Sequence, residues 1–195
     1  MGHIFCLMGK SSSGKDTIYS QLLKDRSLGL DHIVTGTTRP IRAGEQNGRE
    51  CYFYSTQEMD ALKAAGKIIE CRGYRTVHGM WYYFTVADDR IDLDSQNYLV
   101  ITTLEAYQKM AAYYGKDALI PIYLEVDDGL RLQRALDRER EQKEPKYAEL
   151  CRRFLADEED FSTEKLREAG ICRIFQNTNL DQTVDEIKAY IRGIG

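Results

Sequence analysis

Gly9-Lys10-Ser11-Ser12-Ser13-Gly14-Lys15-Asp16-Thr17 stands near the start of this 195-residue chain and predicts the organisation of the residues around it. A short apolar run, His3 to Met8, precedes it, and Ile18, Leu22 and Leu23 follow at helical spacing. The pattern therefore predicts a buried strand, a glycine-bounded loop and a helix in succession. In that context G-x-x-x-x-G-K forms a phosphate-binding loop.

This loop suits a polyphosphate because its backbone N–H groups can turn toward an anion. Gly9 and Gly14 permit backbone angles that a side chain disfavours. The helix that begins near Lys15 adds unpaired N–H groups at the positive end of its dipole. Lys15 supplies a mobile charge that can follow a phosphoryl group during its transfer.

The residue after this lysine departs from the usual motif. Ser or Thr commonly stands there and its hydroxyl ligates magnesium, whereas this chain has Asp16 followed by Thr17. A carboxylate is also a good hard-oxygen ligand. The sequence therefore predicts a Mg²⁺ site at Asp16, Thr17 or both, and leaves open which of them touches the ion.

Composition is that of one globular domain. Lys plus Arg total 27 against 31 Asp plus Glu, a net charge of −4, which favours neither nucleic acid nor a membrane surface as a partner. Because no stretch could span a bilayer and no signal peptide is evident, we expect a cytoplasmic protein. The five cysteines are widely spaced and form no C-x-x-C pair, so we expect reduced thiols.

Beyond the loop, apolar runs alternate with helical patterns, which predicts a parallel sheet covered on both faces. The expected strands are 32–34, 98–101, 118–126 and 170–176, and the expected helices are 104–114, 130–140, 146–168 and 180–191. The strands expected at 51–55 and 67–71, with a short helix at 57–65 between them, belong to a separate segment of the chain whose interpretation follows from the resemblance described below. Pro145 predicts a break between two charged helices.

Thr37-Thr38-Arg39-Pro40, with Arg42, Gly44, Glu45 and Gly48 after it, resembles the acceptor-binding loop of guanylate kinases. The segment from Val77 to Thr85 is similar to that family's histidine-glycine-x-tyrosine-tyrosine-glycine-threonine segment. The resemblance covers essentially the whole chain. It implies an α/β P-loop kinase with a central parallel sheet flanked by helices, a small mixed β insertion that binds the acceptor, and a helical lid. The implied boundaries within the single domain 1–195 are core 1–36, 86–138 and 150–195, insertion 37–85 and lid about 139–149.

The resemblance also implies an activity: transfer of a phosphoryl group from ATP, with Mg²⁺, to GMP or dGMP, so that the partners are small nucleotides. The ATP-binding residues would be Gly9, Ser11, Ser12, Ser13, Gly14, Lys15, Asp16 and Thr17. Catalysis would rest on Lys15 together with the lid arginines Arg134, Arg138 and Arg153. A solvent-facing helix laced with ion pairs would show similar arginines, so that alternative stays open.

On the acceptor side, Arg39, Arg42 and Tyr83 would hold the phosphate, and Thr35 would lie near the base. Glu70 would accept hydrogen bonds from the N1–H and 2-amino groups of guanine. Thr102 would complete the site.

Several departures from the family cluster on this acceptor side. Cys51 replaces a tyrosine, Thr102 stands where the family has acidic residues, and Phe84 replaces a glycine. The interval from Glu70 to Gly79 is longer than in the family. Two alternatives follow: a P-loop kinase acting on another phosphorylated acceptor such as ribose 1,5-bisphosphate, and a non-catalytic guanylate-kinase-like binding module. The sequence gives no guide to oligomeric state.

Overall fold

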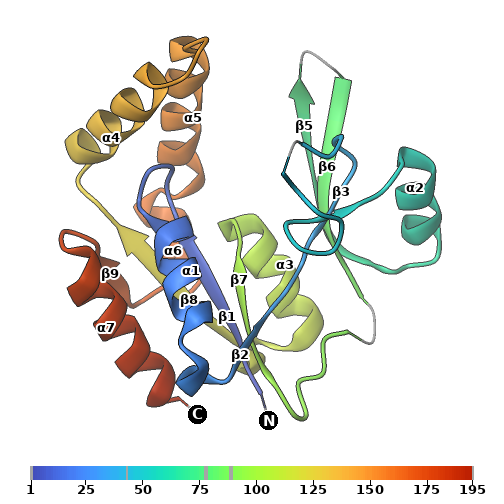
Figure 1. Ribbon diagram of the computed structural model, residues 1–195. Helices are drawn as coiled ribbons and strands as arrows, with labels where there is room; N and C mark the ends of the chain where they lie inside the picture. Colours follow the sequence, from blue (N-terminus) through green and yellow to red (C-terminus); the bar gives the residue numbers. More distant parts are fainter. Residues whose placement is uncertain (1, 43, 77–78, 88–89, 195) are drawn as a thin grey trace.

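The computed structural model describes residues 2–42, 44–76, 79–87 and 90–194. A parallel five-stranded sheet of order β2-β7-β1-β8-β9 forms the core, so the predicted fold class is confirmed (Figure 1). The strands are β1 (Ile4–Gly9), β2 (Leu30–His32), β7 (Asn97–Ile101), β8 (Leu119–Glu125) and β9 (Ile174–Gln176).

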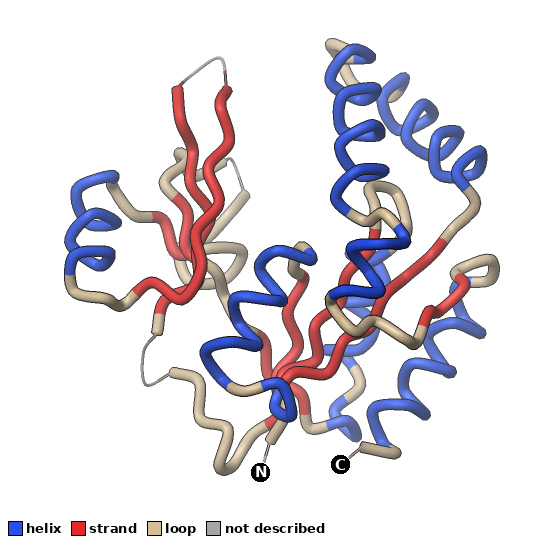
Figure 2. The backbone as a smooth tube through the Cα atoms, turned by 180° about the vertical axis from the view of Figure 1, so that it is seen from behind, coloured by secondary structure: helices blue, strands red, loops and turns tan. Residues whose placement is uncertain are grey.

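The central strand β1 is apolar throughout because helices cover both faces of the sheet. Phe5 and Leu7 pack with α1 (Lys15–Lys24) and α7 (Leu180–Arg192) on one face. On the other face, Cys6 and Met8 belong to the cluster formed by α3 (Leu104–Tyr114) and α6 (Thr163–Glu168). Figure 2 shows from behind the helices that cover the sheet. Short 3-10 turns at Arg26–Leu28 and Lys116–Ala118 complete the core.

A second, mixed sheet of order β4-β3-β6-β5 stands to one side of the core (Figure 1). Its elements are β3 (Gly36–Thr37), β4 (Tyr52–Phe53), α2 (Thr56–Ala64), β5 (Ile68–Thr76) and β6 (Gly79–Val86). Phe84, where the resemblance led us to expect a glycine, is fully buried here against Gly36, where a Cβ would lie 2.6 Å from the ring. The missing side chain at position 36 therefore makes room for the ring at position 84.

On the opposite side of the core, α4 (Asp128–Arg140) and α5 (Tyr147–Asp160) form a helical hairpin (Figures 1 and 2). The single helix predicted over 146–168 is wrong: α5 ends at Asp160 and α6 starts anew, because the Ser162 side chain accepts from Lys165 N and caps it. The strand predicted from residue 170 begins only at Ile174. Gly170, with φ of +73°, first ends α6.

No helix in the described ranges combines the length and the apolar composition needed to cross a bilayer.

Candidate functional site

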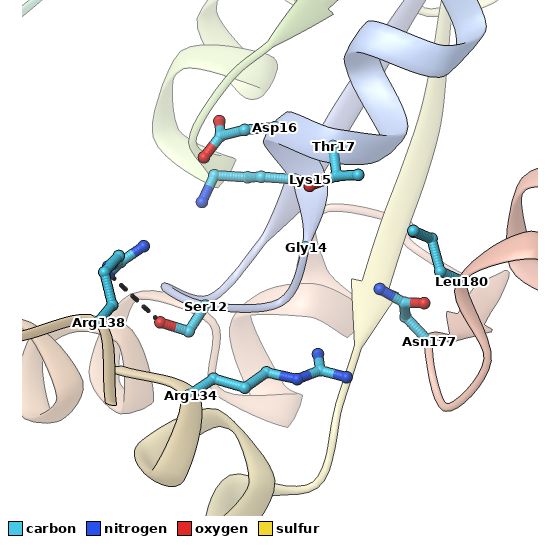
Figure 3. Close-up of a pocket in the computed structure, with 9 residues that line it drawn as sticks. All are labelled: Ser12, Gly14, Lys15, Asp16, Thr17, Arg134, Arg138, Asn177 and Leu180. Atoms are coloured by element: carbon cyan, nitrogen blue, oxygen red, sulfur yellow. Dashed lines mark hydrogen bonds between the residues drawn. The ribbon is translucent and has the colours of Figure 1, made fainter. Parts of the chain in front are cut away.

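The loop between β1 and α1 opens into a cavity of about 310 Å³ (Figure 3). The residues that line it are Ser12, Gly14, Lys15, Asp16, Thr17, Arg134, Arg138, Asn177 and Leu180. All of these except Asn177 and Leu180 are residues that the sequence assigned to ATP binding or catalysis. The structure thus brings the start of α1 and two arginines of α4 to one cavity, which we call the donor cavity.

The backbone of the loop is shaped by a glycine and by a distant asparagine. Gly14 caps α1 with φ of +88°, and a Cβ there would lie 2.6 Å from Asn177 Nδ2. The same Nδ2 donates to the Ser13 carbonyl at 2.8 Å, and Asn177 is buried. This residue follows β9, 164 positions along the chain, so local sequence carries no signal of the contact.

The cations around the donor cavity are largely uncompensated. Within the described part of the chain, the Lys15 and Arg134 side chains form no hydrogen bond or ion pair, and Arg138 donates only to Ser12 Oγ, at 3.4 Å. In Figure 3 the Lys15 ammonium and the Asp16 carboxylate extend in the same direction from the start of α1. Unpaired positive charge at a helix N-terminus favours binding of a polyphosphate.

A buried arginine below the loop joins it to the helical hairpin. The Arg131 side chain, 1% exposed, donates from Nη2 to Asp128 and to Glu158, both at 2.6 Å, and from Nη1 to the Ser11 carbonyl at 3.2 Å. Its guanidinium also lies over the Phe154 ring. The Arg131 hydrogen bond holds the pKa of Asp128 below its usual value. Arg131 was not among the lid arginines selected from sequence, since a charged helix does not show which arginine is buried.

Acidic residues of α5 also contact the loop directly. Lys10 Nζ donates to Glu158 at 2.6 Å, and Ser11 N donates to Asp157 at 2.7 Å. The Ser11 N–H therefore binds a carboxylate of the protein in this structure rather than facing the donor cavity. We call Lys10, Arg131, Asp128, Asp157 and Glu158 the loop-lid network.

Four predicted residues lie away from the donor cavity lining. Gly9 ends β1, where a Cβ would lie 2.9 Å from the Leu124 carbonyl oxygen, so its role is close packing. Ser11 and Ser13 lie in the loop without lining the cavity. Arg153 lines another cavity, of about 470 Å³ at the hairpin tip, which shares only Arg138 with the donor cavity. The Arg153 Nε lies 3.7 Å from Glu149 Oε1.

The metal ligands predicted from sequence, Asp16 and Thr17, both line the donor cavity. The described residues include no cluster of three or more His, Cys, Asp or Glu side chains able to hold a metal. A single carboxylate, a hydroxyl, phosphate oxygens and waters suit Mg²⁺, which retains several waters in such sites. The side chains present therefore fit Mg²⁺ beside a bound nucleotide.

Arginines of the 37–48 loop are arranged differently. Arg39 is 7% exposed and donates through both terminal nitrogens to Glu45, at 2.7 and 2.6 Å. Glu45 also accepts from Arg42 N at 2.8 Å. Hydrogen bonding from Arg39, followed by that from Arg42, lowers the pKa of Glu45 to about 2. Arg39 is thus fully paired within its own loop, whereas the Arg42 side chain is exposed.

Glu70 lies buried in β5, 3% exposed, and its carboxylate accepts from Thr85 Oγ1 at 2.9 Å and from Arg72 Nε at 3.0 Å. Tyr83 lies on β6, and its ring forms an edge-to-face pair with that of Tyr74, with 5.7 Å between the ring centroids. The predicted segment 77–85 includes Val77 and His78, which lie outside the described residues.

Thr35 lines a second cavity, of about 680 Å³, which shares Asp16 with the donor cavity. Arg39, Glu70 and Tyr83 do not line it. Thr102 follows β7, is 7% exposed and bonds through its N–H to the Leu7 carbonyl. The predicted acceptor residues therefore do not converge on one cavity here.

Comparisons with known proteins agree with this architecture. A family model described as guanylate kinase matches residues 1–193. Similar curated proteins include guanylate kinases of Porphyromonas gingivalis, 33% identical over 61% of this chain and 63% of that protein, and of Neisseria meningitidis serogroup A, 38% identical over 53% and 48%. These matches span less than two thirds of the relatives' own length. A crystal structure of guanylate kinase from Anaplasma phagocytophilum shares the fold, with a TM-score of 0.64 and 19% identity over 98% of this chain and 85% of that one.

Proposed function

This chain belongs to the guanylate kinase family, and we propose that it transfers the terminal phosphoryl group of ATP to the phosphate of GMP. One observation carries the proposal: Lys15, Asp16, Arg134 and Arg138 line a single cavity at the mouth of a phosphate loop. Phosphoryl transfer needs positioning and charge neutralisation more than covalent chemistry by the protein. The donor cavity supplies cations from two elements that can act on the same phosphoryl group.

On the donor side, Lys15 and the backbone at the start of α1 would bind the ATP phosphates. Arg134 and Arg138 would stabilise the charge that develops on the transferred group. Asp16, Thr17 or both would hold Mg²⁺, which, when bound, neutralises phosphate charge. The loop-lid network fixes α4 against the loop, so the arginines are held near the phosphates before ATP arrives.

On the acceptor side, Arg39, Arg42 and Tyr83 would hold the GMP phosphate. Arg39 must exchange the Glu45 carboxylate for that phosphate, a replacement of one anion by another in the same bidentate geometry. Arg42, whose side chain is exposed, is free to reach the ligand first. Acceptor binding would therefore require Arg39 to break its ion pair with Glu45, whereas ATP binding breaks no comparable ion pair of Lys15 or Arg134 among the described residues.

A second acceptor class is favoured by one specific contact. Arg72 and Thr85 already donate hydrogen bonds to the Glu70 carboxylate. A phosphorylated acceptor without a base, such as ribose 1,5-bisphosphate, makes no use of that carboxylate, so its binding would not be weakened by this pairing. A non-catalytic binding module is less well supported, since such a module does not need the unpaired Lys15 of an open phosphate loop.

The test is a screen of GMP, dGMP, other nucleoside monophosphates and ribose phosphates, with ATP, Mg²⁺ and coupled detection of ADP. We expect GMP or dGMP to give the highest rate, and Lys15→Ala to remove it. Lys116→Ala, which alters an exposed lysine of the 116–118 turn, is the matched control. Turnover of a ribose phosphate alone would transfer the assignment to the second acceptor class, and no turnover of any acceptor would support the binding module.

A further inference from the structure

The face of the mixed sheet that carries Tyr83 also carries an arginine outside the sequence motifs. Along the β5–β6 ladder, Arg72 lies opposite Tyr83 and Glu70 opposite Thr85, and β3 places Thr37 opposite Tyr83. Since side chains alternate along a strand, these residues share one face. Arg72 therefore stands between the tyrosine expected to hold the acceptor's phosphate and the carboxylate expected to read its base.

The Glu70 carboxylate is already engaged on this face. Arg72 donates from Nε to Oε2 at 3.0 Å and from Nη2 to Oε1 at 3.4 Å, and Thr85 donates to Oε1 at 2.9 Å. The Glu70 side chain is 1% exposed and the Arg72 side chain 15%. Both carboxylate oxygens thus have donors, and the guanidinium is the more accessible partner.

This pairing conflicts with simple reading of guanine by Glu70. The N1–H and 2-amino groups of guanine are donors, and a guanidinium offers donors only. Guanine must therefore compete with Arg72 for the carboxylate, whose Oε1 already accepts from two donors and whose Oε2 accepts from one. Displacement is resisted from the core as well, because Arg72 Nη1 also donates to Thr103 Oγ1 at 3.3 Å, at the N-cap of α3.

Resting on the proposed function, we propose that Arg72 determines acceptor specificity by occupying the carboxylate that would otherwise read guanine. The site then discriminates weakly between GMP and IMP, whose base lacks the 2-amino group. A site with a free carboxylate placed for both donors would reject the poorer base far more strongly. Arg72 is a specificity-determining residue in this scheme and takes no part in the phosphoryl transfer itself.

The experiment compares GMP with IMP in the wild type, Arg72→Ala and Arg72→Lys, by coupled ADP detection and by isothermal titration calorimetry. In the wild type we expect kcat/KM for GMP to exceed that for IMP by less than about tenfold. In Arg72→Ala we expect that ratio to rise roughly tenfold, mainly through a lower KM for GMP, because the freed Glu70 gains a charged hydrogen bond with the 2-amino group. Arg72→Lys, which keeps the charge without the guanidinium fork, should lie between the two.

A second pair of variants isolates the role of Glu70. In a Glu70→Gln background, adding Arg72→Ala should leave the GMP to IMP ratio unchanged. Arg72→Gln replaces Arg72→Ala if thermal melting shows that the alanine variant is unfolded. A purely structural role for Arg72 would instead lower the use of both nucleotides together.

The proposal is overturned by a wild type that strongly prefers GMP, by equal effects of Arg72→Ala on both nucleotides, or by a folded Arg72→Ala protein that binds no GMP in calorimetry. If the wild type transfers no phosphoryl group to either nucleotide, the proposed function fails. The calorimetric ratio of Kd values for GMP and IMP still tests Arg72 in that case.

Discussion

The donor and acceptor regions use their charged side chains in opposite ways. At the donor cavity, Lys15 and Arg134 are unpaired within the described part of the chain, and the nearby carboxylates of Asp128 and Glu158 are bound by Arg131 and Lys10 instead. In the insertion, Arg39 is paired with Glu45, and Glu70 with Arg72. One region leaves its cations unpaired at a cavity, and the other pairs its charged residues with one another.

This contrast bears on how each region would select its ligand. A preorganised set of cations binds any polyphosphate and depends on the scaffold beneath it. Internally paired charges instead require each ligand to compete with a partner already in place. Under the proposed function, acceptor binding would therefore depend on the strength of two ion pairs in the insertion, whereas donor binding would depend on cations that the loop-lid network holds in place.

The largest effect is expected from Lys15→Ala, which breaks the donor side. If Lys15 acts on the transferred phosphoryl group as proposed, the change should lower the rate of phosphoryl transfer by roughly a thousandfold or more. The melting temperature should stay near that of the wild type, because Lys15 forms no ion pair among the described residues. Wild-type turnover in a folded Lys15→Ala protein would disprove the assignment of the donor cavity.

Arg131→Met tests the scaffold beneath the donor cavity. Removing the buried Arg131 deprives Asp128 of its closest partner and leaves Glu158 with Lys10 alone among the described residues, and because both carboxylates are partly exposed we expect the free energy of unfolding to fall by about 1–3 kcal/mol. Arg134→Met, on the same helix but unpaired, should change it by less than about 0.5 kcal/mol while reducing kcat. Urea unfolding of both variants separates these outcomes, and equal stability losses would contradict the distinction.

Asp16→Asn examines the residue shared by the two cavities. If Asp16 holds Mg²⁺, the amide should raise the Mg²⁺ concentration for half-maximal rate by roughly tenfold, since a neutral oxygen binds a hard cation less well. Thr17→Ala is the comparison, measured by Mg²⁺ titration of the rate at fixed ATP. An increase seen only in Thr17→Ala would assign the ligand to Thr17.

The smallest effect concerns pH and the acceptor loop. Bonding to Arg39 lowers the pKa of Glu45 from 4.5 to about 2, so this carboxylate stabilises the folded loop fully above about pH 4.5 and loses that contribution as the pH falls toward 2. We expect the wild type to melt at most a few degrees above Glu45→Gln at pH 6. This difference in melting temperature should disappear as the pH is lowered from 4.5 to 2. A difference that stays constant over this range would show that Glu45 does not form the ion pair with Arg39.

Local sequence predicted most of the architecture. A strand, a glycine-bounded loop and a helix follow from short-range rules, and the structure places β1, the loop and α1 in that order. The helix at 104–114 was predicted with the bounds observed for α3. The Ser162 cap inside the predicted helix at 146–168 was missed, because a run of charged helix formers outweighed one capping residue in the pattern.

Tertiary structure decided which charged residues remain available to a ligand. Asn177 reaches Ser13 from far along the chain, and Arg131 is buried because α5 brings Glu158 and Phe154 against it. Arg72 contacts Glu70 because both side chains lie on one face of β5, which requires the strand to continue past residue 71, where the sequence predicted its end. The sequence by itself determined the phosphate loop, whose chemistry lies in consecutive residues. The ion pairs were determined only by the fold. Their partners lie on different elements, as for Arg131 and Glu158, or on β5, whose length is set by its pairing with β6.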